Sequence, residues 1–330
     1  MKVLSLFDGL SGGRIALDRL GFDVEEYYAS EIDKHAIKVA QHNYPNTIHI
    51  GSVVDVDTEE LPFIDLLVGG SPCQGFSFSG TVKGSSTKCN IDVVSLEQYL
   101  ELKEQKFEFN GQSYLFWEYM RVLTALRKKN PNIKFLLENV IMTQKWQCMF
   151  DEAIGTPPIM INSRLVSAQN RRRLYWTNIQ VDGQPTDKGI ALKDILENKP
   201  TKVKCGASRG RYTDKEKTTT IQMMELRTDD KTNTLTTVQK DNYIIANCDL
   251  TGQYSMKNFG MGTTDKKFSY RKLSPIECER LQTVPDDYTS VVSDTQRCKM
   301  LGNGWTIDVI CHLLKNVNKV AKPENINVLF

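Results

Sequence analysis

The chain has 330 residues, enough for one large domain or for a large and a small one. Hydrophobic residues make up 40% and charged residues 25% of the sequence, which is typical of a soluble globular protein. No run of about 18 apolar residues occurs, so we expect no membrane span. The apolar stretch before the first glycine cluster is too short for a signal peptide, and we therefore expect a cytoplasmic protein.

The net charge of +2 neither requires nor excludes a nucleic acid partner. Seven basic residues lie between Lys199 and Lys217, opposed only by Asp214 and Glu216; taken alone, this stretch is typical of a solvated loop. The 8 cysteines form no CxxC pair, so neither a disulfide framework nor a metal site is expected.

Strands and helices alternate in the first part of the chain. The hydrophobic pattern predicts strands at residues 3–7, 24–30, 47–50, 65–68 and 133–137, and helices at 15–20, 33–43 and 115–127. This βαβ rhythm predicts an α/β fold with a doubly wound, mostly parallel sheet.

Two segments interrupt this rhythm. The stretch 83–111 reads as an insertion that is mobile at its start and has a helix near 96–106. After about residue 180, polar turns and threonines predict a smaller, irregular domain that ends near residue 270, with short strands at 234–238 and 243–246. Helices are predicted again at 276–281 and 307–320.

A glycine cluster joins the first strand to the first helix. Gly9 and Gly12 allow the backbone to approach a ligand closely, but the spacing is not that of a GxGxxG dinucleotide site. Glu31 ends the second strand, where a carboxylate can accept hydrogen bonds from two ribose hydroxyls. The glycines alone also fit a tight connection; together with Glu31 they predict a nucleoside site.

Two further motifs stand at strand ends, where ligands bind in open α/β sheets, and a third lies within a strand-like stretch. Cys73 stands in a Ser-Pro-Cys-Gln turn, although a lone cysteine is more often a small buried hydrophobic residue. Glu138 ends an apolar strand, where a carboxylate is costly unless it is paired or used. In the strand-like stretch after Gln169, alternation places Arg171 and Arg173 on one face and Arg172 on the other, unless this is only a solvated charge run.

In order, these motifs resemble those of cytosine-5 DNA methyltransferases along nearly the whole chain. The matching motifs are the Phe-x-Gly loop at 7–9, Pro-Cys-Gln at 72–74, Glu-Asn-Val at 138–140, Gln-x-Arg-x-Arg at 169–173, the Ser-Pro-containing stretch 271–282 and Leu-Gly-Asn-Gly-Trp at 301–305. They are similar to the Pro-Cys-Gln type found in bacterial and phage restriction–modification systems. The resemblance implies a class I S-adenosylmethionine-dependent methyltransferase sheet (residues 1–180 and 271–330) and a smaller irregular target-recognition domain (181–270).

The resemblance also implies roles for individual residues. Cys73 would attack C6 of a flipped-out cytosine in double-stranded DNA, Glu138 would contact N3, Arg173 would hold O2, and Arg171 would order Cys73 and Glu138. The cofactor site would be lined by Phe7, Gly9, Leu10, Gly12, Glu31, Ile32, Ser52, Val53, Pro72, Leu115, Asn303 and Gly304. Asn139 would brace the Pro72–Cys73 turn. Gln74, Ser77, Thr234 and Leu235 would contact DNA, and no metal is implied.

The sequence departs from the family pattern at the third strand, where the family carries Asp after Gly to bind the adenine amino group. Here Ser52 follows Gly51, and either Ser52 or Asp55 after a local shift takes that role. The insertion at 83–111 is also longer than usual, and we expect it to lengthen the catalytic loop or to contact DNA.

Two rival functions remain open. The related RNA branch carries Pro-Pro-Cys-Gln and Cys-Phe-Thr motifs, which this chain lacks, and a catalytically dead DNA-binding regulator would not keep Cys73, Glu138 and Arg173. We expect a monomer in the cytoplasm of a bacterial or phage-infected bacterial cell, with a cognate restriction endonuclease, where there is one, acting separately. Within a recognition domain, the basic stretch 199–217 is expected to contact phosphates.

Overall fold

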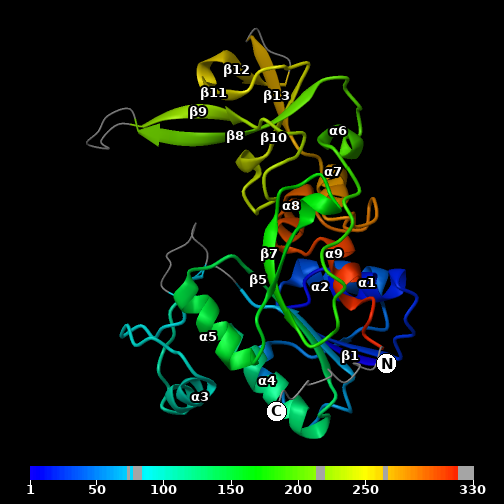
Figure 1. Cartoon of the computed structure of the whole chain (residues 1–330), viewed down its shortest axis with the longest axis vertical. Coiled ribbons are helices and arrows are strands. Elements are labelled where there is room, and N and C mark those ends of the chain that lie inside the picture. Colours follow the sequence, from blue (N-terminus) through cyan, green and yellow to red (C-terminus); the bar gives the residue numbers. More distant parts are fainter. Residues whose placement is uncertain (73–74, 77–83, 213–219, 263–266, 319–330) are drawn as a thin grey trace, which may run out of the picture.

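A seven-stranded sheet lies at the centre of the larger half of the molecule (Figure 1). The computed structural model describes residues 1–72, 75–76, 84–212, 220–262 and 267–318. The strands follow the order β3-β2-β1-β4-β5-β7-β6. Their bounds are β1 Lys2–Leu6, β2 Glu26–Ser30, β3 Ile48–His49, β4 Leu66–Gly70, β5 Lys134–Val140, β6 Ile159–Asn162 and β7 Arg172–Thr177.

The pairing of these strands confirms the predicted α/β fold with a mostly parallel sheet. The strands from β3 to β5 are parallel, whereas β7 runs antiparallel to both β5 and β6. Strand order reverses between β1 and β4, because the chain goes from β1 outward to β2 and β3 before it returns to β4. A ligand is expected beyond the carboxyl ends of the strands at this switch point.

Helices cover both faces of the sheet (Figure 1). Their bounds are α1 Gly12–Arg19, α2 Lys34–Asn43, α3 Leu96–Glu104, α4 Leu115–Lys129, α5 Gln144–Ile154, α6 Leu192–Ile195, α7 Pro275–Leu281, α8 Asp294–Asn303 and α9 Ile307–Leu314. One hydrophobic cluster joins α1, α7, α8 and α9 to one face, and a second joins α4 and α5 to the other. In the described part of the chain, no helix is long and apolar enough to cross a membrane.

Local sequence explains where several helices begin. Ser274 and Glu277 form a capping box, and Pro275 occupies the first turn, so the Ser-Pro-x-Glu sequence starts α7. Asp33 caps α2 by accepting the backbone N–H of His35 at 2.8 Å. The prediction of a helix at 307–320 was too long, because α9 ends at Leu314.

A second sheet of six strands lies at the far end of the molecule from α4 (Figure 1). Its order is β11-β9-β8-β10-β13-β12, with bounds β8 Val203–Tyr212, β9 Thr220–Leu226, β10 Tyr243–Ala246, β11 Gly252–Ser255, β12 Phe259–Met261 and β13 Phe268–Lys272. The β8–β9 hairpin projects over the side of the molecule on which α5 and α3 lie. The strand expected at 243–246 is present, whereas that expected at 234–238 is absent and the segment is a loop.

The insertion contains the predicted helix, α3, but its described start is packed rather than loose. Ser85 and Thr87 are fully buried. The Trp117 indole N–H donates to Ser85 Oγ at 3.1 Å, and the Val93 N–H donates to the Ser85 carbonyl at 2.8 Å. Residues 84–87, at the described start of the insertion, are therefore packed into the core around α4.

Candidate active site

A pocket of about 440 Å³ lies at the carboxyl ends of β1, β2, β4 and β5. All twelve residues that the resemblance assigned to the cofactor site line this pocket: Phe7, Gly9, Leu10, Gly12, Glu31, Ile32, Ser52, Val53, Pro72, Leu115, Asn303 and Gly304. Glu138, Arg171 and Arg173 line it too. Residues from opposite ends of the chain thus meet at the switch point of the sheet, as expected for a ligand site.

The glycine turn and Glu31 are held together by backbone hydrogen bonds. Glu31 Oε2 accepts the Gly9 N–H at 2.8 Å, and Oε1 accepts the N–H groups of Ile32 and Asp33, each at 2.8 Å. Gly9 has a φ of 59°, which favours glycine, whereas Phe7 (57°) and Ser11 (63°) adopt this region in spite of their side chains. Such strained backbone persists at sites where the surrounding structure fixes it.

Asp8 lies buried beneath this turn and was not predicted as a site residue. It lines the pocket and accepts hydrogen bonds from Ser11 Oγ at 2.6 Å and from the Tyr27 hydroxyl at 2.7 Å. Burial raises the pKa of Asp8 above the ordinary carboxyl value, although hydrogen bonds from Ser11, Ser5 and Tyr27 oppose the shift. The sequence could have suggested Asp8, because this residue stands inside the glycine turn, directly before Gly9.

The structure separates the two residues considered for the adenine position. Ser52 lies in the pocket, directly before Val53. Asp55 is exposed and is not part of the pocket lining. The Ser30 hydroxyl donates to the carbonyl of Gly51 at 2.9 Å and so fixes the turn that carries Ser52.

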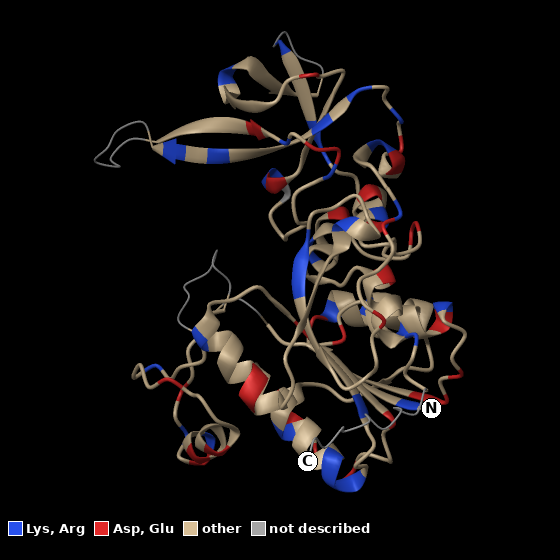
Figure 2. Cartoon of the chain, viewed as in Figure 1, with Lys and Arg blue, Asp and Glu red and all other residues tan. Residues whose placement is uncertain are grey.

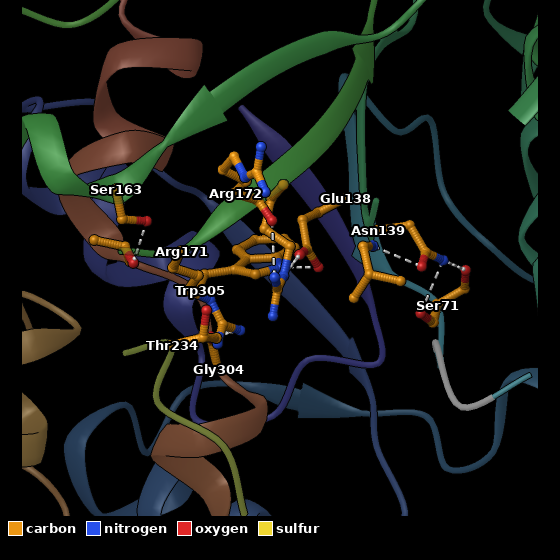
Figure 3. A network of polar contacts seen from close by, with 12 residues as sticks. Ser71, Glu138, Asn139, Ser163, Arg171, Arg172, Thr234, Gly304 and Trp305 are labelled. Atoms are coloured by element: carbon orange, nitrogen blue, oxygen red, sulfur yellow. Dashed lines mark hydrogen bonds and ion pairs between the residues drawn. The ribbon is translucent and has the colours of Figure 1, made fainter. Parts of the chain in front are cut away.

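Glu138 and Arg173 form an ion pair at the β5 end of the pocket, where Glu138 lies beside Trp305 (Figure 3). Arg173 Nε lies 3.0 Å from Glu138 Oε1, and the Trp305 indole N–H donates to Glu138 Oε2 at 3.2 Å. Gly70 makes this contact feasible, because a Cβ there would lie 2.9 Å from the indole nitrogen and 3.0 Å from Oε2. Neither residue was assigned a role from the sequence, although Trp305 stands in the Leu-Gly-Asn-Gly-Trp motif and Gly70 directly precedes the Ser-Pro-Cys-Gln turn.

Arg171 and Arg173 both line the pocket while Arg172 is exposed, which confirms the predicted alternation along this strand. Arg171 is only 3% exposed. Its guanidinium donates to the carbonyls of Leu235 at 2.8 Å, Gly302 at 3.3 Å and Gly304 at 2.9 Å. Arg171 therefore joins β7 to the Leu-Gly-Asn-Gly motif and to the loop before β10.

Asn139 reaches back to the turn that precedes Cys73. Its Nδ2 donates to Ser71 Oγ at 3.0 Å and to the Ser71 carbonyl at 3.3 Å (Figure 3). Pro72, the next residue, lines the pocket. Cys73, Gln74 and Ser77 lie outside the described residues, so their predicted roles stay predictions.

Thr234 and Leu235, expected to contact DNA, make contacts within the protein. The Thr234 hydroxyl donates to the Asn170 carbonyl at 2.7 Å, and the Leu235 N–H donates to Gln169 Oε1 at 3.1 Å. The Leu235 side chain is buried. This pair thus fastens the second half of the molecule to the Gln-x-Arg-x-Arg motif, and DNA contact remains a prediction for both residues.

Further lining residues were not predicted. They are Asp8, Ser30, Asp33, Ala36, Val54, Gly70, Ser71, Gln112, Tyr114, Val140, Gln296, Lys299, Met300, Gly302 and Trp305. Most are neighbours of predicted residues, so proximity in the sequence could have suggested them. In the described part of the chain, no group of three or more His, Cys, Asp or Glu side chains could hold a metal ion.

Relatives and solved structures agree with this architecture. The chain is 32% identical over 213 residues to the orphan methyltransferase M.SPRI of Bacillus phage SPR, covering 60% of this chain and 42% of the relative. It is 26% identical over 321 residues to the type II methyltransferase M.NlaX of Neisseria lactamica, covering 94% of this chain and 93% of the relative. The chain thus spans about two fifths of the phage relative.

Two solved structures share the fold. A Spodoptera frugiperda DNMT2 mutant has a TM-score of 0.57 at 18% identity, covering 96% of this chain and 99% of that one. The Entamoeba histolytica methyltransferase EhMeth has a TM-score of 0.59 at 12% identity, covering 96% and 97%. The chain therefore shares the fold of these two proteins. The family model for C-5 cytosine-specific DNA methylases matches residues 1–147 and 163–319, and the chain belongs to this family.

Proposed function

We propose that the chain transfers a methyl group from S-adenosylmethionine to C5 of a cytosine flipped out of double-stranded DNA, within a specific sequence. The observation that carries this proposal is the shared pocket. One end is built from the glycine turn, Glu31 and Ser52, and the other end carries the Glu138–Arg173 ion pair. A nucleoside-containing donor and a polar, planar base can therefore meet in one enclosure.

The residues present fit S-adenosylmethionine. Glu31 is fixed by three backbone N–H groups, which leaves its carboxylate placed to accept hydrogen bonds from ribose hydroxyls. Ile32 is 71% exposed although it is apolar, which suits an adenine ring packing on it. When bound there, S-adenosylmethionine supplies a methyl group on a positively charged sulfur. The pocket volume lies within the usual range for ligand sites, about 300–1,000 Å³.

Cys73 supplies the nucleophile in this mechanism. Its thiolate forms a bond to C6 of the cytosine, and the electron pair of the C5–C6 double bond moves into the ring, so that C5 can accept a methyl group. Methyl transfer leaves S-adenosylhomocysteine, solvent then takes the proton from C5, the C5–C6 double bond re-forms, and the Cys73 thiolate leaves. Flipping is needed because C6 cannot be reached within a stacked duplex.

Glu138 and Arg173 would bind the edge of the cytosine. A proton held between the Glu138 carboxyl and N3 draws electron density from the ring during attack at C6. Arg173 can keep Nε on Glu138 while other guanidinium N–H groups donate to O2. Trp305 fixes the second carboxyl oxygen and so limits rotation of Glu138. These contacts place the carboxyl before the base arrives, which is how a site lowers its barrier by preorganisation.

We infer that the two sheets belong to two domains with different functions. Residues 1–180 and 271–330 form the catalytic domain and 181–270 the target-recognition domain. Support comes from the six-stranded sheet at 203–272, which stands apart from the pocket, and from the projecting β8–β9 hairpin (Figure 1). Figure 2 shows basic residues along β8 of this hairpin, which suits a polyanionic partner.

Covalent trapping tests the proposal. The chain, S-adenosylmethionine and a random-sequence duplex containing 5-fluorocytosine should give a denaturant-stable adduct, because fluorine at C5 cannot leave as a proton does. Cys73→Ser should give none while it still binds DNA. An RNA duplex in place of DNA tests the rival substrate. Adducts that form on RNA but not on DNA would show that RNA is the substrate. Adducts with Cys73→Ser would contradict the covalent mechanism.

Sequencing after bisulfite treatment then gives the target. DNA from cells that express the chain should carry C5-methylated cytosine in one short sequence context. Methylation at cytosines without a common context would contradict the proposed sequence specificity.

A further inference from the structure

Glu118 is a buried carboxylate that the proposed reaction does not use. It lies in α4, one turn after the pocket residue Leu115, and its side chain is 0% exposed. A buried charge is costly unless cations and hydrogen bonds compensate it. The partners of Glu118 therefore show what this charge holds together.

Two of these partners come from α3, inside the insertion. The Tyr99 hydroxyl and Lys103 Nζ (2.5 Å) both bind Glu118 Oε1. Burial, and then the hydrogen bond to Glu118, raise the pKa of Tyr99, so its hydroxyl remains a donor. The insertion is thus attached to α4 through a charged, fully buried acceptor.

The third partner leads to the pocket. Arg121 Nε binds Glu118 Oε2 at 2.7 Å. The other guanidinium nitrogens of Arg121 donate to the carbonyls of Val56 and Val53, each at 3.0 Å. Val53 follows Ser52, and both line the pocket. Glu118 therefore orients the guanidinium of Arg121, which holds the turn at 52–56. This is the turn proposed to bind the adenine.

An aromatic contact makes a second link between the insertion and the pocket. Tyr114 lines the pocket directly before α4. Its ring stacks on Phe109 with centroids 5.0 Å apart and on Tyr99 with centroids 6.2 Å apart. Both Phe109 and Tyr99 belong to the insertion, so this segment supports two separate walls of the pocket.

We propose that the insertion sets the affinity for S-adenosylmethionine, with Glu118 as the positioning residue between α3 and the turn at 52–56. This rests on the proposed binding of S-adenosylmethionine in the pocket. Glu118 does not line the pocket, and it acts through Arg121. The role predicted for the insertion from sequence, a longer loop or a DNA contact, does not require this connection.

Titration calorimetry with S-adenosylmethionine and with its product S-adenosylhomocysteine tests the proposal. Glu118→Gln keeps the shape but removes the charge, and Arg121→Met removes the guanidinium. Each should raise both dissociation constants by about 3- to 30-fold. In steady-state assays the KM for the cofactor should rise, while the KM for DNA and kcat at saturating cofactor stay at the values of the unaltered chain.

Asp92→Asn is the matched control. Asp92 belongs to the same insertion and binds Lys145 of α5 at 2.5 Å. This change therefore loosens the insertion at a contact that does not involve Arg121. It should leave both dissociation constants unchanged. If Glu118→Gln does not fold, as judged by circular dichroism, Lys103→Met replaces it, because Lys103 is 39% exposed and its removal is milder.

The outcomes separate the two proposals. If the unaltered chain binds neither ligand, the proposed cofactor is wrong. If it binds them and the folded Glu118, Arg121 and Lys103 variants bind equally well, the inference is wrong while the proposed function stands. Equal weakening by Asp92→Asn would overturn the role assigned to Glu118 as the positioning residue, because any disturbance of the insertion would then suffice.

Discussion

Ser52 is the residue at which this chain departs from its family within the pocket. A serine hydroxyl can accept a hydrogen bond from an adenine amino group but brings no charge. We expect Ser52→Asp to tighten S-adenosylmethionine binding by roughly 1 kcal/mol, the usual gain from a charge-assisted bond. Titration calorimetry measures this change in binding free energy. Asp55→Asn is the control and should change nothing, since Asp55 is exposed and outside the pocket lining; the reverse pattern would assign the role to Asp55.

Asp8 gives a pH-dependent prediction. Its folded-state pKa is raised, chiefly by burial, so folding favours the protonated form. The stabilisation is fully present below the unfolded-state pKa and is lost as pH rises through the raised folded-state value. We therefore compare the free energy of unfolding of the unaltered chain with that of Asp8→Asn. The difference, unaltered chain minus variant, should fall as pH rises from the unfolded-state pKa to the folded-state pKa of Asp8, and it should level off at higher pH. Urea unfolding at a series of pH values measures the difference, and parallel curves would contradict the prediction.

At the scale of residues, sequence alone could identify those that stand in ordered motifs. The pocket lining includes every cofactor residue carried over from the family, from Phe7 to Gly304. Contacts that depend on the fold could not be found in this way. No spacing rule places Trp305 on Glu138, 167 positions apart, or lets Gly70 leave the space between them.

Among elements, the β8–β9 hairpin separates basic residues that the sequence groups together. Arg209 and Arg211 lie on the same face of β8 as Cys205. Cys205 belongs to the hydrophobic cluster that also contains residues of α7, α8 and the large sheet. Lys204 pairs with Ile245 on the opposite face. The described part of the 199–217 stretch, residues 199–212, is therefore not a single surface, and only the Arg209 face of β8 shares a side with the cluster on the large sheet.

Neutralising Arg209 and Arg211 together, as glutamines, should weaken DNA binding and flatten its salt dependence. The expected loss is about one unit of slope for each phosphate contact removed. Both arginines are about half exposed and share Glu225 as an ion-pair partner, so they can exchange it for phosphate. Lys204→Gln is the matched control on the other face. Binding titrations at several salt concentrations measure the slopes, and equal effects of the two changes would refute the assignment of faces.

The insertion shows what sequence patterns cannot give for an element. A helix near 96–106 was predicted from sequence and is present at 96–104, because local sequence is enough to favour a helix there. Its attachment depends on Tyr99, Lys103 and Glu118 meeting across 15–19 positions in a packed core. Small polar residues at 85–87 suggested mobility, but tertiary packing buries them.

At the scale of the whole molecule, the two sheets meet where Arg171 and Gln169 bind the loop before β10. This loop is the 234–238 segment that the sequence predicted as a strand. Its threonines favour extended backbone, but its polar groups bond to the catalytic half instead of to a neighbouring strand. Contact is close: a Cβ on Gly302 would lie 2.4 Å from the carbonyl carbon of Thr236. The two sheets are therefore joined through backbone carbonyls.

Arg171→Met should break this coupling. It removes the donor that the carbonyls of Leu235, Gly302 and Gly304 share, and of the three Gly304 keeps the Gln282 amide as a donor, so the free energy of unfolding should fall by about 2–4 kcal/mol. The loss should also separate the halves, so that unfolding is no longer a single transition.

The positions of the tryptophans make this separation measurable. All 4 tryptophans, Trp117, Trp146, Trp176 and Trp305, lie outside the six-stranded sheet at 203–272. Tryptophan fluorescence therefore reports on the catalytic half, whereas far-ultraviolet circular dichroism reports on both. In urea, the two signals should coincide for the unaltered chain and for Arg172→Met, whose side chain is exposed. In Arg171→Met, circular dichroism should begin to change at lower urea than fluorescence, because the six-stranded sheet loses its attachment first. Coincident transitions in that variant would show that other contacts join the two halves.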